Sequence, residues 1–422
     1  MAKDTSKHPC FNKASSGDCG RVHLPVAPKC NIQCNYCNRK YDCVNESRPG
    51  VSSGVLGPAQ AVLYMEQVLE KEPRITVAGI AGPGDPFANP IRTLTTLRLL
   101  KERYPDLLFC LSSNGLGVPD HLDEIAEVGV THMTITVNAV DPEIGQKIYS
   151  WVRDGKILYQ GRDAAELLLS RQIAAIKGLK ERGITVKVNT IIIPGVNDDH
   201  IPEVAAAMAE LGADIQNMIP IHPTEETLFE NIEEPSKTRV RELRAEIGKI
   251  IPQMTHCRRC RADAVGLLCK DRSTELAPAL KSCARSEVPE HKGRPFVAVC
   301  TREGMLINQH LGEATSFQIW KQDGDDFTMT EERRAPRQGC GPKRWKELGE
   351  LLSDCRAVLA EAIGETPRRE LTESGTTPHV CSGFIRDALE TIYSDGDMNR
   401  FKGRKGGVVK ACCSGGGGEG CG

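Results

Sequence analysis

Apolar positions in the first two thirds of the chain recur with two periods, one typical of helices and one typical of strands. Apolar residues spaced three or four apart predict helices at 58–71, 90–103, 120–128, 163–182, 200–211 and 236–250. Apolar, β-branched runs between them predict strands at 22–26, 75–79, 107–112, 131–137, 185–193 and 214–219. Strands that alternate with helices form parallel sheets, so residues 21–268 are expected to be an α/β unit, a partial or complete parallel (β/α) barrel.

A second, smaller α/β unit is predicted over residues 295–398, a normal size for a domain. Its expected strands are 295–300, 316–321 and 357–363, and its expected helices are 342–352 and 383–393. A hairpin signal, Asp-Gly-Asp-Asp, lies at 323–326.

Three segments show neither period. Residues 1–20 are expected to form an ordered N-terminal arm, and the polar residues 269–294 a linker. Residues 399–422 are too rich in glycine to build a core and are expected to be a disordered tail. Three cysteines lie in this tail, and their role stays open: Cys412, Cys413 and Cys421.

Charge narrows the class of partner, and cysteine content points to metal. The chain of 422 residues has 54 basic and 56 acidic side chains, so nothing indicates nucleic acid or an anionic membrane as a partner. No apolar segment resembles a leader or a membrane span, and a cytoplasmic protein is expected. Cytosolic thiols rarely form disulfides, so 18 cysteines, clustered at 10–43, 257–283 and 412–421, indicate metal binding.

The most informative cluster is a CxxxCxxC run formed by Cys30, Cys34 and Cys37. Three thiolates on one loop can hold three irons of a [4Fe–4S] cluster. The fourth iron is then open to the amino and carboxylate groups of S-adenosylmethionine (SAM). A zinc knuckle is the alternative, but zinc sites usually pair two CxxC units. Tyr36 stands where an aromatic residue often precedes the third cysteine. The run therefore predicts a radical SAM cluster.

Polar and small residues follow the predicted strands, where the active sites of parallel barrels lie. The two glycines of Gly-Pro-Gly-Asp-Pro allow a ligand to approach the backbone closely. Turns use the same residue types, but five strand ends in succession favour a SAM site. The candidate cofactor-binding residues are Tyr36, Gly82, Gly84, Asp85, Ser112, Asn114, Asn138, Asn189 and Ile191.

Further cysteines and a histidine exceed the needs of one cluster. Cys10, Cys19 and His23 precede the CxxxCxxC run, and each alone could be an incidental thiol or a surface imidazole. A CxxC pair at 257–260 lacks the βαβ setting of a redox dithiol, which favours metal ligation. Cys110 lies near the end of its predicted strand, where it could face the barrel mouth or be a buried core thiol.

Taken together, these motifs resemble the NifB family of nitrogenase cofactor maturases. The resemblance runs from about residue 7 to 268. The residues that carry it are His8-Pro-Cys10, the run from Cys19 through His23 to Cys37, Ala81-Gly-Pro-Gly-Asp-Pro86, and Cys257-Arg-Arg-Cys260-Arg-Ala-Asp-Ala264.

The resemblance implies two further [4Fe–4S] precursor clusters, fused in the barrel into an [8Fe–9S–C] cluster. One SAM would methylate a sulfide, and a second would give the 5′-deoxyadenosyl radical that abstracts hydrogen from this methyl group. Expected partners are a cluster donor, cofactor carrier or scaffold proteins and a reductant protein. The implied ligands of the two precursor clusters are Cys10, Cys19, His23, Cys110, Cys257 and Cys260. Spacing does not settle which ligand holds which cluster.

The second unit resembles the NifX-like domain that binds iron–molybdenum cofactor, with a ribonuclease-H-like fold. The carrying segments are 307–314, 339–341 and 351–359. His310 and Cys340 are its candidate cluster contacts, with a hydrogen-bonded turn histidine and a surface thiol as the alternatives.

Two other functions remain open from the sequence alone. One is a different radical SAM reaction with auxiliary clusters. His8-Pro-Cys10 and His23 argue against it, because radical SAM proteins in general lack these residues. The other is a non-catalytic iron–sulfur scaffold or carrier, which would need neither the open iron nor the glycine-rich loop.

Overall fold

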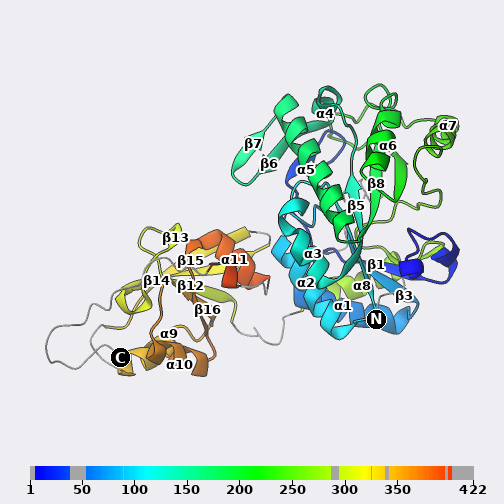
Figure 1. The fold of residues 1–422 in the computed structure, drawn as a ribbon. Helices are drawn as coiled ribbons and strands as arrows, with labels where there is room; N and C mark the ends of the chain where they lie inside the picture. The colour runs from blue at the N-terminus through cyan, green and yellow to red at the C-terminus, as the bar shows by residue number, and fades with distance from the viewer. Residues whose placement is uncertain are drawn as a thin grey trace. The chain divides into compact units, whose positions relative to one another are not determined.

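The computed structural model describes residues 5–38, 54–88, 90–286, 294–324, 326–337, 342–394 and 398–401. The chain divides into two compact units, Met1–Ser286 and Glu287–Gly422, each with a main sheet of its own (Figure 1). No helix among the described residues is long and apolar enough to span a membrane. Cys340, Cys412, Cys413 and Cys421 lie outside the described residues.

The first unit is built on an eight-stranded sheet with the order β11-β10-β1-β3-β4-β5-β8-β9. The six strands from β1 to β9 are mutually parallel, whereas β10 pairs with β1, and β11 with β10, in antiparallel fashion. The sheet is therefore a partial barrel with β9 and β11 at its edges, as expected. The strands are β1 (Gly20–His23), β3 (Ile75–Ile80), β4 (Leu108–Ser113), β5 (Val130–Thr136), β8 (Thr185–Ile192), β9 (Ile215–Pro220), β10 (Val265–Leu267) and β11 (Lys270–Asp271).

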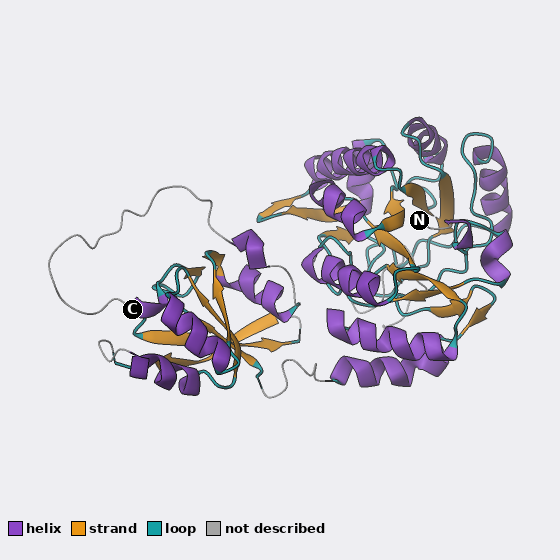
Figure 2. Cartoon of the chain, turned by 60° about the horizontal axis from the view of Figure 1, so that its bottom comes forward, coloured by secondary structure: helices purple, strands orange, loops and turns teal. Residues whose placement is uncertain are grey.

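Six helices lie within two residues of their predicted bounds at most ends. They are α1 (Pro58–Lys71), α2 (Pro90–Arg103), α3 (Leu122–Val128, after the 3-10 turn η3, Val118–His121), α5 (Gly161–Glu181), α6 (Ile201–Glu210) and α7 (Lys237–Ile247). Proline is the first residue of both α1 and α2. It favours the start of a helix, because the backbone N–H that proline lacks would have no intrahelical partner at that position. Figure 2 shows helices packed along the outside of the sheet.

Strand alternation gives the sheet two different faces. Successive side chains of a strand point to opposite sides. In β4, Phe109 belongs to the main apolar core and lines no cavity, while Cys110 and Ser112 line an internal cavity that Leu111 of the core also borders. In β8, Val186 and Val188 join the core, while Lys187 lines the cavity. The inner face of the partial barrel thus carries polar side chains among apolar ones.

Several elements of the first unit were not expected from the sequence. Helix α4 (Pro142–Ile148) leads into a hairpin of β6 (Tyr149–Asp154) and β7 (Ile157–Tyr159), and β2 (Ile32–Cys34) pairs with β6. Ile157 and Leu158 are exposed in this hairpin, so these apolar residues do not mark a buried face of the strand. The segment with the CxxxCxxC run, residues 27–37 (the cysteine loop), therefore contributes strand β2 to a small three-stranded sheet.

The segment 269–294, expected to be an irregular linker, instead contains helix α8 (Ser273–Arg285). Leu276, Leu280 and Cys283 are buried at helical spacing, and α8 contacts α1. Pro278 lies inside the helix and resembles a breaker in the sequence. Burial of one apolar stripe outweighs the cost of this proline.

The second unit contains a five-stranded sheet with the order β15-β14-β12-β16-β17. β12, β16 and β17 are parallel, whereas β14 and β15 add antiparallel strands at one side. This mixed α/β architecture agrees with the expected fold class. Its elements are β12 (Phe296–Val299), β13 (Leu306–Ile307), β14 (Ser316–Asp323), β15 (Asp326–Arg334), α9 (Pro342–Leu351), β16 (Cys355–Ala360), α10 (Glu365–Glu373), β17 (Thr377–Val380), β18 (Gly383–Phe384) and α11 (Ile385–Tyr393).

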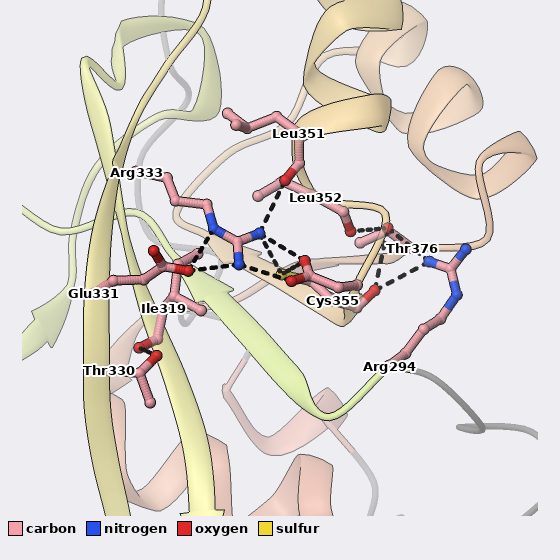
Figure 3. Close-up of polar contacts among 10 residues, drawn as sticks. Arg294, Ile319, Thr330, Glu331, Arg333, Leu351, Leu352, Cys355 and Thr376 are labelled. Atoms are coloured by element: carbon pink, nitrogen blue, oxygen red, sulfur yellow. Dashed lines mark hydrogen bonds and ion pairs between the residues drawn. The ribbon is translucent and has the colours of Figure 1, made fainter.

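Two arginines donate hydrogen bonds to the start of β16 and the segment before it (Figure 3). Arg333 on β15 donates to both carboxylate oxygens of Asp354, at 2.6 and 2.7 Å, and to the Leu351 carbonyl oxygen at 2.9 Å. These hydrogen bonds from Arg333, together with its positive charge, lower the pKa of Asp354. Arg294 donates to the carbonyl oxygens of Cys355 and Ser374 at 3.2 and 2.7 Å. The two arginines therefore join β15 and the segment before β12 to the start of β16 and the residue before it by charge-assisted hydrogen bonds.

Candidate functional site

The CxxxCxxC residues form a compact loop after β1. Cys34 is buried, and Cys30 and Cys37 are half-buried. Gln33 donates from Nε2 to the carbonyl oxygens of Cys34 and Cys37, at 3.1 and 2.6 Å. The Cys37 amide also donates to the Cys34 carbonyl oxygen at 3.0 Å. The backbone that presents the three sulfur atoms is therefore fixed by its own hydrogen bonds.

The glycine-rich loop after β3 is docked directly onto the cysteine loop. The Gly84 amide donates to the Ala27 carbonyl oxygen at 2.6 Å, and the Asp85 amide donates to the Lys29 carbonyl oxygen at 2.7 Å. A Cβ atom on Gly84 would lie 2.1 Å from the Lys29 carbonyl oxygen, and Gly82 has a φ of +148°. Gly84 thus makes room for the cysteine loop itself, and its expected approach to a ligand stays a prediction.

Asp85 links this loop to the end of β4. Its carboxylate accepts hydrogen bonds from the Phe87 amide at 2.8 Å, the Asn114 amide at 2.6 Å and the Ser113 hydroxyl at 3.0 Å. Complete burial raises the pKa of Asp85, while these donors oppose the rise. The Asn114 side chain in turn lies 3.9 Å, Nδ2 to Sγ, from Cys30. Asp85 is thereby a buried connector whose oxygens bind protein groups.

Asn138, just after β5, gathers two other predicted residues. Its Nδ2 donates to the Tyr36 hydroxyl at 2.9 Å and to the Tyr149 hydroxyl at 3.3 Å, and its Oδ1 accepts from the Ile191 amide at 2.9 Å. Asn197 donates to the Asn138 carbonyl oxygen at 2.8 Å. Tyr36, Asn138 and Ile191 are therefore brought together, and Tyr149 is a partner that the sequence did not indicate.

Two cavities that share Cys10, His23 and Lys187 lie along the inner face of the sheet. The first also includes Cys110 and Ser112. The second is lined by Cys10, His23, Lys187, Asn217, Ile219, Met254, Cys257, Arg258, Cys260 and Leu268. Five of the six implied precursor-cluster ligands thus face these cavities.

Cys19 and Cys110 depart from the expected placement. Cys19 precedes the N-terminal end of β1, opposite to His23, and lines neither cavity. Cys110 lies within β4 and not at its end, so it faces the interior of the partial barrel and not the mouth. Asn189 is also internal, where its Oδ1 accepts a hydrogen bond from Asn217 at 3.2 Å.

Cationic groups surround the cavity sulfurs. Arg21 is almost fully buried and donates from Nη2 to Cys260 Sγ at 3.0 Å and to Asp271 at 3.1 Å. Burial alone would lower the pKa of Arg21, but these anionic partners raise it. Lys187 is buried as well, and its Nζ lies 5.2 Å from the centroid of Phe11. Buried positive charge suits anionic clusters of iron, sulfide and thiolate.

The hydrogen bonds of His23 define which ring nitrogen can act as a ligand. Nδ1 lies 2.9 Å from the Arg261 carbonyl oxygen. A carbonyl oxygen only accepts, so Nδ1 carries the proton and the neutral ring has its lone pair on Nε2. Such a bond to the remote nitrogen is typical of metal-binding histidines.

The donor set suits clusters better than a single ion. Among the residues that the structure describes, no three His, Cys, Asp or Glu side chains are grouped as a mononuclear site would require. A cubane spreads its protein ligands over separate irons, each taking one. The residues in hand therefore fit a cluster at Cys30, Cys34 and Cys37, and they offer further donors in the cavities.

In the second unit, His310 is committed to local structure. Its Nδ1 accepts from the Gly312 amide at 2.9 Å and caps the short turn η5 (Leu311–Glu313). This is the hydrogen-bonded turn histidine that the sequence left open as an alternative.

Several cavity residues escaped the sequence analysis: Arg21, Lys187, Asn217, Arg258 and His8 as a side chain in its own right. The sequence did contain a signal for some of these residues. Polar residues at every second position of an otherwise apolar strand, as in Val-Lys-Val-Asn at 186–189, indicate a second face that is not apolar core.

Comparison with known proteins defines the class first. Residues 24–208 match the radical SAM superfamily, and residues 294–395 match the family described as dinitrogenase iron-molybdenum cofactor. The first unit is a radical SAM domain, and the second is an iron–molybdenum-cofactor domain of the NifX-like kind.

Close relatives then give the family. The FeMo cofactor biosynthesis protein NifB of Chlorobaculum tepidum is 49% identical over 425 residues, covering 100% of both chains. That of Klebsiella pneumoniae is 41% identical and covers 93% of this chain and 90% of its own. The chain belongs to the NifB family of FeMo cofactor biosynthesis proteins. Methylornithine synthase (PylB), a solved structure, aligns with a TM-score of 0.38 at 17% identity, over 55% of this chain and 63% of its own, too low for further argument.

Proposed function

We propose that this radical SAM protein fuses two [4Fe–4S] substrate clusters with one further inorganic sulfur atom, supplied from outside the chain, and inserts a carbide derived from the methyl group of SAM, which gives an [8Fe–9S–C] cofactor precursor. Cys30, Cys34 and Cys37 would hold the resident cluster. When bound, that cluster with SAM supplies the methyl group and the radical chemistry. The substrate clusters would be held by the remaining candidate ligands: Cys10, Cys19, His23, Cys110, Cys257 and Cys260.

One observation carries this proposal: the same two strands line the cavity and support the cysteine loop. Ala81 at the end of β3 lines the inner cavity, and three residues later Gly84 is hydrogen-bonded to the cysteine loop. Ser112 of β4 lines the cavity, and two residues later Asn114 lies beside Cys30. A methyl group delivered at the loop would therefore need to travel only a short way to a cluster in the cavity.

The residues of the chain have separate tasks in this scheme. Arg21 and Lys187 would hold anionic substrate clusters by charge. His23 would offer Nε2 as a neutral ligand, weaker than a thiolate and able to release iron when two clusters are joined. If His23→Cys made the product as fast as the wild-type protein does, this lability would have no role.

The second unit would hold the product or pass it to a carrier protein of nitrogenase cofactor assembly. Support comes from its family match alone. An iron–sulfur donor, a cofactor carrier or scaffold and a reductant protein would be the partners, and the cytoplasm the compartment.

The test is iron and acid-labile sulfide per chain after purification without oxygen. About 12 irons, which is three cubane clusters, are expected in the wild-type protein, and about 8 in Cys257→Ala with Cys260→Ala. A value near 4 that reconstitution does not raise would contradict the proposal and favour another radical SAM reaction. A full complement of clusters without cleavage of SAM would favour a scaffold.

A further inference from the structure

His8 occupies an unusual position at the wall of the first cavity. It lies in the N-terminal arm, has an exposed fraction of 2%, and lines the cavity with Cys10, His23 and Cys110. Its ring contacts those of Phe11 and His132, with centroids 4.7 and 4.3 Å away. The imidazole is thus held in place by packing.

The hydrogen bonds of His8 fix its tautomer. The Cys10 amide donates to Nδ1 at 3.2 Å, so Nδ1 carries the lone pair. In the neutral ring the proton is then on Nε2, which becomes an N–H donor. His23, on the same cavity, has the opposite tautomer, because its Nδ1 donates to a carbonyl oxygen. Two imidazoles therefore face one cavity with different chemistry, one with a lone pair and one with a proton.

The Nε2 of His8 is buried and has no hydrogen-bond partner among the residues that the structure describes. A buried donor without an acceptor is costly and calls for an explanation. Arg21 and Lys187, which share the cavity, are cations and offer no acceptor. An anionic sulfur ligand in the cavity would supply what is missing.

We propose that His8 is a positioning residue whose Nε2–H donates a hydrogen bond to a sulfur atom of the substrate cluster bound beside Cys10 and Cys110. This inference rests on the proposed function. Hydrogen bonds to cluster sulfurs raise the reduction potential, because they stabilise the more negative, reduced form. His8 would therefore retain the cluster and ease its reduction without ligating iron.

The experiment separates the donor from the ring. His8→Gln keeps an N–H group near the place of Nε2 but loses the ring, and His8→Phe keeps the ring but has no donor. His8→Asn keeps an acceptor for the Cys10 amide and lacks the remote donor. Full-length proteins would be loaded with iron and sulfide without oxygen, after circular dichroism has shown that each is folded. The readouts are iron per chain, the rate of iron loss to a chelator, and the reduction potentials followed by electron paramagnetic resonance.

We expect the phenylalanine and asparagine variants to lose the substrate cluster roughly tenfold faster than the wild-type protein, or to fail to bind it, because a charge-assisted hydrogen bond is gone. Their remaining cluster should have a more negative potential, and the glutamine variant should lie near the wild-type values. Equal behaviour of all variants, or a glutamine variant worse than the phenylalanine variant, would overturn the inference.

Failure of this inference is distinguishable from failure of the proposed function. Cys10→Ala with Cys110→Ala should lose about four irons if a substrate cluster lies there. If that double variant loses iron and the His8 variants do not change, only the role of His8 is wrong. If the double variant keeps all its iron, the cavity binds no cluster and both proposals fall.

Discussion

Replacing Gly84 by alanine should disturb the cysteine loop although no cysteine is changed. The new Cβ would lie 2.1 Å from the Lys29 carbonyl oxygen, whereas real Cβ contacts essentially never fall below 3.0 Å. The two backbones must therefore separate by about 1 Å, which strains the hydrogen bonds from Gly84 and Asp85 to the loop. Overpacking costs about 1–3 kcal/mol, and each weakened hydrogen bond about 0.5–1.5 kcal/mol, so a loss near 3 kcal/mol is expected.

The assay is iron per chain with release of 5′-deoxyadenosine from SAM, measured beside thermal unfolding. Gly84→Ala should bind the resident cluster poorly and cleave SAM at least tenfold more slowly than wild type, since a loss of 1.4 kcal/mol already corresponds to about tenfold. Gly17→Ala is the matched control, because a Cβ there meets nothing within 4 Å. Full iron content and normal cleavage in Gly84→Ala would refute the idea that close contact between these two loops seats the cluster.

Three further outcomes follow from the site and the second unit. Cys34→Ala should abolish cleavage of SAM, whereas Cys257→Ala should keep some cleavage but form no carbide-containing product, as separate assays of 5′-deoxyadenosine and product cluster would reveal. Deletion of residues 292–422 should leave carbide insertion intact if the second unit only holds or transfers product; loss of the chemistry in a folded truncated protein would contradict this. Arg333 lowers the pKa of Asp354, so this ion pair stabilises the second unit at neutral pH and its contribution is lost as the pH falls through the folded pKa. Unfolding of the full chain should therefore become less pH-dependent in Asp354→Asn, and an unchanged acid profile by tryptophan fluorescence would argue against it.

Most of the first unit was predictable because its strands and helices have strong periods and clear boundaries. The bounds of α1 and α2 were predicted because each starts with proline. Helix α8 was missed because Pro278 hides an amphipathic stripe. Strand β7 of the hairpin was missed because its apolar residues Ile157 and Leu158 are exposed.

The sequence predicted which residues could be ligands better than it predicted where these residues lie in the structure. Motif residues identified the cysteine loop, and strand-end logic placed Asn138 and Asn114 near it. The other residues that line the cavities were harder to find, since Lys187 and Asn217 belong to no motif and their placement depends on which side of a strand faces inward. The role of His8 depends on a hydrogen bond to its other nitrogen, which no sequence pattern reveals.

The alternation of β4 also limits how this protein can change over evolutionary time. Cys110 and Ser112 line the cavity, while Phe109 is fully buried in the main apolar core. Inserting or deleting one residue in the strand would exchange the two faces and turn the benzyl group of Phe109 toward a space lined with sulfur and positive charge. We therefore expect a change of length by a single residue to be less tolerated in β4 than in an exposed loop, where no such alternation has to be kept.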